Sequence, residues 1–435
     1  MEKYTLRAND VNPAQRRAIE SELPILDARL GDPKAHGLMP PNFLQIFDHP
    51  RIGYTDALGL PQLREVLRSG NPELGQGRYR LPLENVAIGA GISGIVRNLL
   101  DAIIDPSKGD TVLIPHWSYI IYLSEAARSG ARVGNIRLTK TGEPDLDHLK
   151  DSIDEKTRAV FLTTIGNPLG VAVSREAFGR VVKIIKEKEK EFDHPILLVA
   201  DPIYEGFRIE GQPLDPIALS IENRRLGPTV SLYSVSKLMA LPDWRLGMAW
   251  FYEGNGEFRA EFRELLAAFA TTNQPLLGSA STTHQADLQR FYSGLMTGGT
   301  YSSQFDAYKS DRVATVRSRV HDFAKALFEI DGLVFPECYY DKAGMPNTSA
   351  LNSFYVMAGI DLKLSPRGEF SLARRFADFL IEKDRKVVLA TPGDSFLEQS
   401  LRGQGNEFMR FVALLSEADA GYVVEQVRGF VNSLK

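Results

Sequence analysis

From residue 86 to about residue 255, hydrophobic and polar positions follow two patterns that alternate along the chain. Short, continuous apolar runs predict strands, and they are separated by segments with apolar residues at helical spacing. Because continuous apolar strands are typical of sheets buried on both faces, the alternation predicts a mostly parallel sheet covered by helices on both faces. The predicted strands span residues 86–91, 111–115, 159–164, 196–200, 230–233 and 247–252.

The pattern changes after residue 255, where helical segments dominate and strands become sparse. A long helix at 303–330 could link two domains, and the rest mixes three strands with two helices. This indicates an α/β chain with a smaller α+β domain. We expect a large domain at 45–300 and a small domain formed by residues 1–44 and 301–435.

Composition narrows the function classes. The 435 residues are 43% hydrophobic and 24% charged, with a net charge of −4 and no conspicuously basic segment, so we expect no nucleic-acid partner. A single cysteine, Cys338, and seven scattered histidines give no metal-ligand spacing. No apolar stretch reaches 18 residues and the N-terminus has no apolar leader, so we expect a cytoplasmic protein without a membrane segment.

Candidate chemistry gathers after the predicted strand at 230–233. Ser234, Ser236 and Lys237 follow it, and Arg245 comes eight residues after the lysine. Serine and arginine side chains bind phosphate, and a lysine in a pocket can become a nucleophilic amine. An amine beside a phosphate cradle is what pyridoxal phosphate (PLP) requires. Taken alone, the motif favours a surface lysine in a serine-rich turn, and only the rest of the chain shifts the balance towards the cofactor site.

A second anion site is indicated where the strand at 86–91 meets a helix. The glycine-rich turn Gly89-Ala90-Gly91 precedes a helical segment that starts at Ile92. Free backbone N–H groups converge at such a junction and favour a bound anion. An ordinary tight turn has the same local pattern.

Seven motifs then occur in a characteristic order. On these motifs the chain resembles the class I/II aminotransferase family, PLP enzymes with the fold of aspartate aminotransferase, from about residue 25 to 414. The motifs are LGDP at 30–33, GYTDALGLPQLR at 53–64, GNPLG at 166–170, DPIYEGF at 201–207, SVSK at 234–237, WRLG at 244–247 and FMRFVALL at 408–415.

The resemblance implies a role for each matching residue. Lys237 would form the Schiff base with PLP and then shuttle a proton, and Asp201 would pair with the pyridine nitrogen. Tyr204 and Asn167 would hydrogen-bond the phenolate oxygen of the cofactor. Trp117 would stack on the pyridine ring and line the substrate site.

The phosphate would be held by Ser234, Ser236, Arg245 and the backbone at Ala90, Gly91 and Ile92. Ile92 departs from the family because it carries no side-chain donor, so backbone amides must supply that contact.

Residues outside the cofactor motifs would complete the site. Arg410 would bind the substrate α-carboxylate, and Gly31 would place its backbone against the substrate. Tyr54 would reach the phosphate of a neighbouring subunit, which implies a homodimer with shared sites.

The resemblance implies transfer of an amino group from an L-amino acid to a 2-oxo acid. A lyase, an aminocyclopropane carboxylate synthase-like enzyme or an oxidase on the same fold stays open as an alternative. A PLP-binding transcription regulator is disfavoured because only about 24 residues precede the first motif. A dinucleotide-binding oxidoreductase is disfavoured because the spaced third glycine after Gly91 is missing. The sequence does not identify the amino acid, the 2-oxo acid or the residues of the side-chain pocket.

Overall fold

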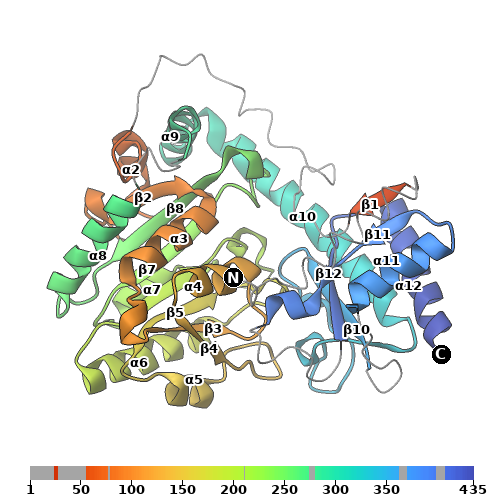
Figure 1. Ribbon diagram of the computed structural model, residues 1–435. Helices are drawn as coiled ribbons and strands as arrows, with labels where there is room; N and C mark the ends of the chain where they lie inside the picture. Colours follow the sequence, from red (N-terminus) through yellow and green to blue (C-terminus); the bar gives the residue numbers. More distant parts are fainter. Residues whose placement is uncertain are drawn as a thin grey trace.

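The computed structural model describes residues 24–27, 55–76, 79–209, 211–273, 280–361, 370–397 and 407–435. In this part of the chain one large sheet, one smaller sheet and a two-stranded pair are present. Figure 1 shows the large sheet and the small one side by side, with the long helix α10 (Thr300–Phe328) running from one to the other.

The large sheet has seven strands, all parallel except one. Strand β8 is antiparallel to both of its neighbours, β2 and β7, and the remaining pairs are parallel. The order across the sheet is β2 (Val86–Ala90), β8 (Leu246–Tyr252), β7 (Thr229–Ser234), β6 (Leu197–Asp201), β5 (Thr157–Thr163), β3 (Thr111–Pro115) and β4 (Arg132–Ile136).

Both faces of this sheet are buried, because successive strand residues enter different hydrophobic clusters. In β3, Val112 and Ile114 pack in one cluster and Leu113 packs in the other. The first cluster includes the apolar faces of α3 (Gly91–Ile103) and α4 (Ile120–Arg128). The second includes α5 (Leu146–Ser152) and α6 (Arg175–Phe192). The layers are therefore helix, sheet and helix.

Four further helices border the large sheet. They are α2 (Pro61–Leu67), α7 (Pro216–Glu222), α8 (Arg259–Thr272) and α9 (Thr282–Met296). Helix α8 packs on α3, and α9 packs on both α2 and α10.

The smaller sheet is antiparallel and carries helices α11 (Leu372–Glu382) and α12 (Glu417–Leu434). Its strand order is β12 (Thr391–Pro392), β13 (Glu407–Val412), β10 (Tyr355–Ile360) and β9 (Leu333–Val334). Beside it, β1 (Ile25–Asp27) pairs in parallel with β11 (Val387–Leu389). This pairing joins the N-terminal segment to the C-terminal part of the chain.

The predicted fold class is confirmed, with some elements missed. Strand β4 and helices α5, α7 and α9 were not predicted, because their apolar positions are few or interrupted. Most residues of the segment 1–44 lie outside the described residues. The domain limits at 44/45 and 300/301 stay a prediction.

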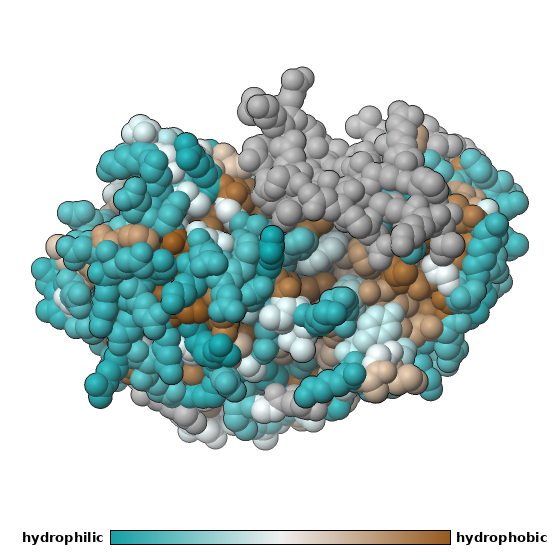
Figure 2. Space-filling model, turned by 90° about the horizontal axis from the view of Figure 1, so that it is seen from below, coloured by the Kyte–Doolittle hydropathy of each residue, from teal (hydrophilic) through white to brown (hydrophobic). Residues whose placement is uncertain are grey.

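The outer surface is mainly hydrophilic on the face shown in Figure 2, with hydrophobic side chains gathered in smaller areas. Among the described residues, the exposed large hydrophobic side chains are Ile221, Met296 and Met345. These three come from separate elements, so they do not indicate one extended apolar surface.

Candidate active site

A cavity of about 330 Å³ lies where the large sheet meets the small one. Asp201 ends β6, Ser234 ends β7 and Asn167 follows β5, so the cavity opens at the carboxyl ends of three parallel strands. This is where ligands bind in open α/β sheets. Arg410 on β13 and Tyr355 on β10 contribute the wall from the smaller sheet.

Most of the predicted site residues are brought together in this cavity. Those that line it are Gly91, Ile92, Asn167, Asp201, Tyr204, Ser234, Ser236, Lys237, Arg245 and Arg410. The cavity is also lined by residues that sequence reasoning missed: Ser93, Tyr119, Tyr122, Thr163, Ile203, Pro242 and Tyr355.

One end of the cavity has the composition of an anion site. The N-terminus of α3 presents Gly91, Ile92 and Ser93, and the two hydroxyl oxygens of Ser234 and Ser236 lie 2.7 Å apart. Ser93 supplies a hydroxyl next to Ile92, where the sequence suggested backbone donors alone. With Arg245, these groups offer hydroxyl, guanidinium and backbone N–H donors at a helix N-terminus.

Two glycines allow the backbone and Arg245 to pack closely at this end of the cavity. A Cβ on Gly247 would lie 2.4 Å from the carbonyl carbon of Gly91, so β8 can cross the start of α3 only without a side chain. Gly91 has φ +71°, and a Cβ there would lie 2.5 Å from Nη2 of Arg245. The guanidinium therefore rests directly on the helix N-terminus.

Asp201 is the buried acid of the site, with 5% of its surface exposed. Its carboxylate accepts a hydrogen bond from the hydroxyl of Tyr122 and another from the backbone N–H of Ile203 at 3.1 Å. Burial raises the pKa of Asp201 to about 6, against the opposing effects of these hydrogen bonds and of Lys237. A cationic N–H beside this carboxylate would favour its ionised form.

Lys237 projects toward aromatic and phenolic groups. Its Nζ lies 5.6 Å from the ring centroid of Phe354, and Lys237 lines the cavity together with Tyr204 and Tyr355. The hydroxyls of Tyr355 and Tyr204 are 2.9 Å apart. The lysine amine therefore shares the cavity with two tyrosine hydroxyls that are hydrogen-bonded to each other.

Arg410 connects the two sheets across the cavity. Its Nη1 donates to Oδ1 of Asn167 at 2.9 Å, and its Nη2 donates to Oγ1 of Thr391 at 3.1 Å. The guanidinium carbon lies 4.4 Å from the ring centroid of Tyr355. The side chain is 7% exposed, and burial lowers the pKa of Arg410. A buried guanidinium facing a cavity is suited to a carboxylate.

Trp117 is not among the residues that line this cavity, contrary to the sequence prediction; Tyr119 is. Trp117 has a left-handed backbone with φ 63°, and its ring meets Phe408 edge-on at 5.6 Å in a neighbouring cavity. This turn places the residue two positions later against the cavity. The two aromatic residues lie only two positions apart in the sequence, and the resemblance favoured the first.

The remaining predicted residues lie outside the cavity or outside the described chain. Ala90 ends β2 and precedes α3, but it does not line the cavity. Tyr54 and Gly31 lie outside the described residues, so their predicted roles stay predictions.

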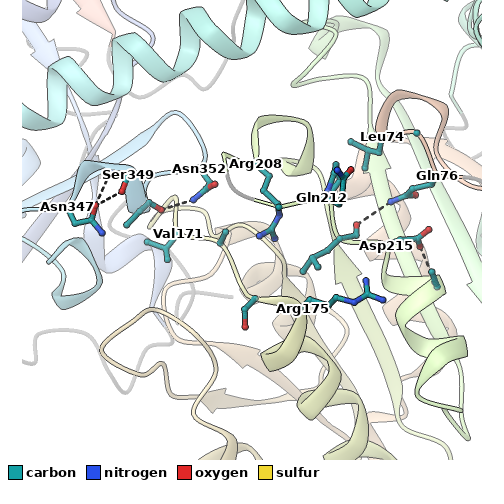
Figure 3. A pocket seen from close by; sticks show the side chains of 18 residues that line it. Leu74, Gln76, Val171, Arg175, Arg208, Gln212, Asp215, Asn347, Ser349 and Asn352 are labelled. Carbon is teal, nitrogen blue, oxygen red and sulfur yellow. Dashed lines mark hydrogen bonds between the residues drawn. The ribbon is translucent and has the colours of Figure 1, made fainter. Parts of the chain in front are cut away.

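A second cavity, of about 820 Å³, is lined by residues from the loops that follow β5 and β6 and is shown in Figure 3. Its Arg208 is held by Glu205 at 2.6 and 2.8 Å, and its Arg175 pairs with Glu222. These ion pairs already compensate both guanidinium groups, and none of the predicted site residues line this cavity.

No metal-binding cluster of three or more His, Cys, Asp or Glu side chains occurs within the described ranges. Over the same residues, the helices are too short or too polar to cross a membrane.

Comparisons with known proteins identify the family and the fold of the chain. The sequence matches the family described as aminotransferase class I and II over residues 48–427. It is 23% identical over 255 residues to a tyrosine aminotransferase of Caenorhabditis elegans, covering 55% of this chain and 52% of that protein. It is 28% identical over 222 residues to an aspartate aminotransferase of Bacillus sp. strain YM-2, covering 51% and 53%. The chain thus spans about half the length of these curated relatives.

The fold is similar to that of an alanine aminotransferase from Pyrococcus furiosus. The TM-score is 0.77 at 20% sequence identity, with 98% of this chain and 97% of that chain covered. Since the family match spans most of the sequence, this chain belongs to the class I and II aminotransferases.

Proposed function

We propose that this protein is a PLP-dependent aminotransferase that transfers the amino group of an L-amino acid to a 2-oxo acid. The observation that carries the proposal is the convergence of Lys237, Asp201, Tyr204 and Arg410 with an anion site in one cavity. Asp201 ends β6, Lys237 follows β7 and Arg410 lies on β13, so the fold brings them together.

The donor set fits PLP. The phosphate is matched by the α3 N-terminus, Ser234, Ser236 and Arg245, and the pyridine nitrogen by the buried carboxylate of Asp201. The hydroxyl of Tyr204 and the amide of Asn167 suit the phenolate oxygen, and Tyr119 replaces Trp117 as the proposed aromatic wall. When bound, PLP supplies an electron sink for the bond-breaking step at the substrate Cα.

The side chains of this protein have distinct tasks in that reaction. Nζ of Lys237 anchors the cofactor and then serves as the base that moves the proton at the substrate Cα. Asp201 holds the proton on the ring nitrogen, and Tyr122 orients its carboxylate. Arg410 binds the α-carboxylate through its planar fork, which Asn167 and Thr391 orient.

The assembly belongs to the same proposal. We infer a homodimer in which Tyr54 of one subunit contacts the phosphate bound by the other, and a location in the cytoplasm. Analytical ultracentrifugation tests the first point, and a monomeric active enzyme would refute the shared site.

Borohydride reduction of the PLP-loaded protein tests the assignment of Lys237. Peptide mapping should find the reduced adduct on Lys237, and a Lys309→Ala control should label like the wild type because Lys309 does not line the cavity. An adduct on another lysine contradicts the proposal.

A panel of amino acids, tested without an acceptor, separates the reaction classes. An aminotransferase converts bound PLP to the pyridoxamine form and releases a 2-oxo acid, whereas a lyase releases ammonia and restores the original spectrum. The second result would favour the alternative function on the same fold.

A further inference from the structure

Two aromatic rings lie close to the guanidinium of Arg410, and only one of them lines the cavity. The guanidinium carbon is 4.4 Å from the ring centroid of Tyr355 and 4.9 Å from that of Phe396. Tyr355 is among the residues that line the cavity, whereas Phe396 is not. Because Phe396 is only 2% exposed, its ring meets Arg410 inside the protein. Phe396 can therefore act on a ligand in the cavity through Arg410, without touching that ligand.

Phe396 belongs to a short segment that also hydrogen-bonds Arg410. Strand β12 pairs with β13 so that Thr391 lies opposite Arg410, and Oγ1 of Thr391 accepts the hydrogen bond from Nη2. The 3-10 helix η11 (Gly393–Phe396) follows β12 directly. A Cβ on Gly393 would lie 2.8 Å from a carbonyl oxygen of β13, so the chain can approach β13 this closely only at a glycine. Residues 391–396 thus form a clamp segment that brings a hydroxyl and an aromatic ring to one guanidinium.

The backbone of Phe396 is anchored to the segment that follows the large sheet's strand β3. Its carbonyl oxygen accepts a hydrogen bond from the backbone N–H of Ser118 at 3.0 Å. Ser118 is 2% exposed and directly precedes Tyr119, which lines the cavity. Since the clamp segment pairs with β13 of the smaller sheet, contacts from both sheets fix the position of the Phe396 ring.

An aromatic ring is a suitable neighbour for a buried guanidinium that has to bind an anion. The face of the ring attracts the cation electrostatically but accepts no strong hydrogen bond from it. A carboxylate in the same place would instead compete with the ligand for the guanidinium. The hydrogen bonds of Arg410 to Asn167 and Thr391 fix the two ends of its planar fork. A ring beside the plane stabilises the charge and limits rotation of the fork.

We propose that Phe396 is a positioning residue, which holds the guanidinium of Arg410 in the orientation that binds a substrate carboxylate. This role rests on the proposed function, because it takes an α-carboxylate as the ligand of Arg410. Loss of the ring should weaken every ligand that carries this carboxylate, since a fork held in one orientation loses less freedom on binding. The groups proposed to hold the cofactor should be unaffected, because Phe396 lies outside the cavity.

Binding of propionate to the full-length, PLP-loaded protein tests the proposal. Propionate offers a carboxylate but has no amino or oxo group to react. Isothermal titration calorimetry at constant ionic strength measures its dissociation constant. Phe396→Leu removes the ring but keeps an apolar side chain, and the dissociation constant should rise about tenfold, as expected for loss of a desolvated cation–aromatic contact.

A second variant, Phe396→pentafluorophenylalanine, separates electrostatics from packing. It keeps the ring but reverses the charge distribution of its face, so the dissociation constant should again rise about tenfold. The matched control is Phe376→Leu, which changes another fully buried phenylalanine, on α11. The ring of Phe376 packs on Phe430 at 5.3 Å, and this variant should bind propionate like the wild type.

Steady-state kinetics give an independent readout. Phe396→Leu should raise KM for an amino acid about tenfold with kcat nearly unchanged, because the lost interaction stabilises the bound substrate and the transition state alike. An amine that lacks the α-carboxylate should show neither change. Equal losses for both compounds would identify a general structural role and contradict the proposal.

The proposal is overturned if either variant at position 396 binds propionate like the wild type, if Phe376→Leu weakens binding equally, or if the wild type binds no propionate. Should Phe396→Leu fail to fold, the pentafluorophenylalanine variant decides, because it preserves the ring. Release of a 2-oxo acid together with propionate binding that is independent of Phe396 refutes only this inference. Binding that depends on Phe396, without release of a 2-oxo acid from any amino acid, refutes only the proposed function.

Discussion

At the scale of single residues, the site is defined by polar groups whose burial is compensated by specific partners. The carboxylate of Asp201 is nearly inaccessible to water, yet the hydroxyl of Tyr122 and the N–H of Ile203 bind both of its oxygens. Such a carboxylate is fixed in orientation before any ligand arrives, which lowers the cost of recognising a ring N–H.

Tyr122→Phe should therefore weaken PLP binding without unfolding the protein. The lost hydrogen bond has a charged acceptor and contributes about 1.5–3 kcal/mol, so the dissociation constant should rise about tenfold to a hundredfold. Equilibrium dialysis of the cofactor measures the change. Tyr422→Phe, on α12 far along the chain, is the control and should bind PLP normally. An unchanged dissociation constant for Tyr122→Phe would show that Asp201 needs no such orientation.

At the scale of elements, a second buried carboxylate, that of Glu73, connects strand β7, which precedes Lys237, to neighbouring helices. Glu73, in the short 3-10 helix η3 (Pro72–Leu74), accepts hydrogen bonds from Tyr233 of β7 at 2.8 Å and from Tyr292 of α9 at 2.5 Å. Lys309 of α10 donates to its backbone carbonyl at 2.8 Å. Through Glu73, the elements η3, α9 and α10 are thus connected to β7, the strand that ends at Ser234.

Glu73→Gln should change how stability depends on pH. Burial raises the pKa of Glu73 from 4.5 to about 7, so the folded state holds this proton more tightly than the unfolded state. The wild type should therefore lose stability as pH rises through this range, by about 3 kcal/mol at ~1.4 kcal/mol per pKa unit. The variant should lack that loss.

Urea unfolding at about pH 5 and about pH 8 measures the difference, since other groups titrate alike in both proteins. Equal pH dependence in the wild type and in Glu73→Gln would mean that Glu73 does not titrate with the pKa assigned to it.

At the scale of the whole molecule, the cavity exists only between the two sheets. Arg410 reaches from β13 to Asn167 after β5, so the contact that orients the guanidinium also joins the two sheets. A carboxylate bound there could draw the two parts together, as ligand-induced closure does in other two-part sites.

Arg410→Lys should keep the bound cofactor and the fold but weaken amino-acid substrates. A lysine offers a point charge in place of a planar fork, and loss of a buried charged partner costs on the order of 2–5 kcal/mol. Steady-state kinetics with an amino acid and with an amine that lacks the α-carboxylate measure the effect, and the amine should be affected far less. Equal losses for both compounds, or unfolding, would identify Arg410 as a structural residue instead.

The sequence by itself determined the fold class, many of the elements and most of the residues proposed for the site that line the cavity. Continuous apolar strands and interposed helices are local patterns, and the ends of two predicted strands mark the cavity positions Asp201 and Ser234. Motif residues with a fixed spacing, Ser234 to Lys237 above all, are likewise readable from the chain.

Only the tertiary structure decided which neighbouring residues face the cavity. Trp117 and Tyr119 are two positions apart, and a left-handed backbone turn selects the second. Tyr122 and Tyr355 carry no motif, because their partners Asp201 and Tyr204 lie 79 and 151 residues away. The antiparallel pairing of β8 with β2 likewise joins strands that lie far apart in the sequence. Such contacts arise from packing between distant segments, which a local pattern of apolar and polar residues does not encode.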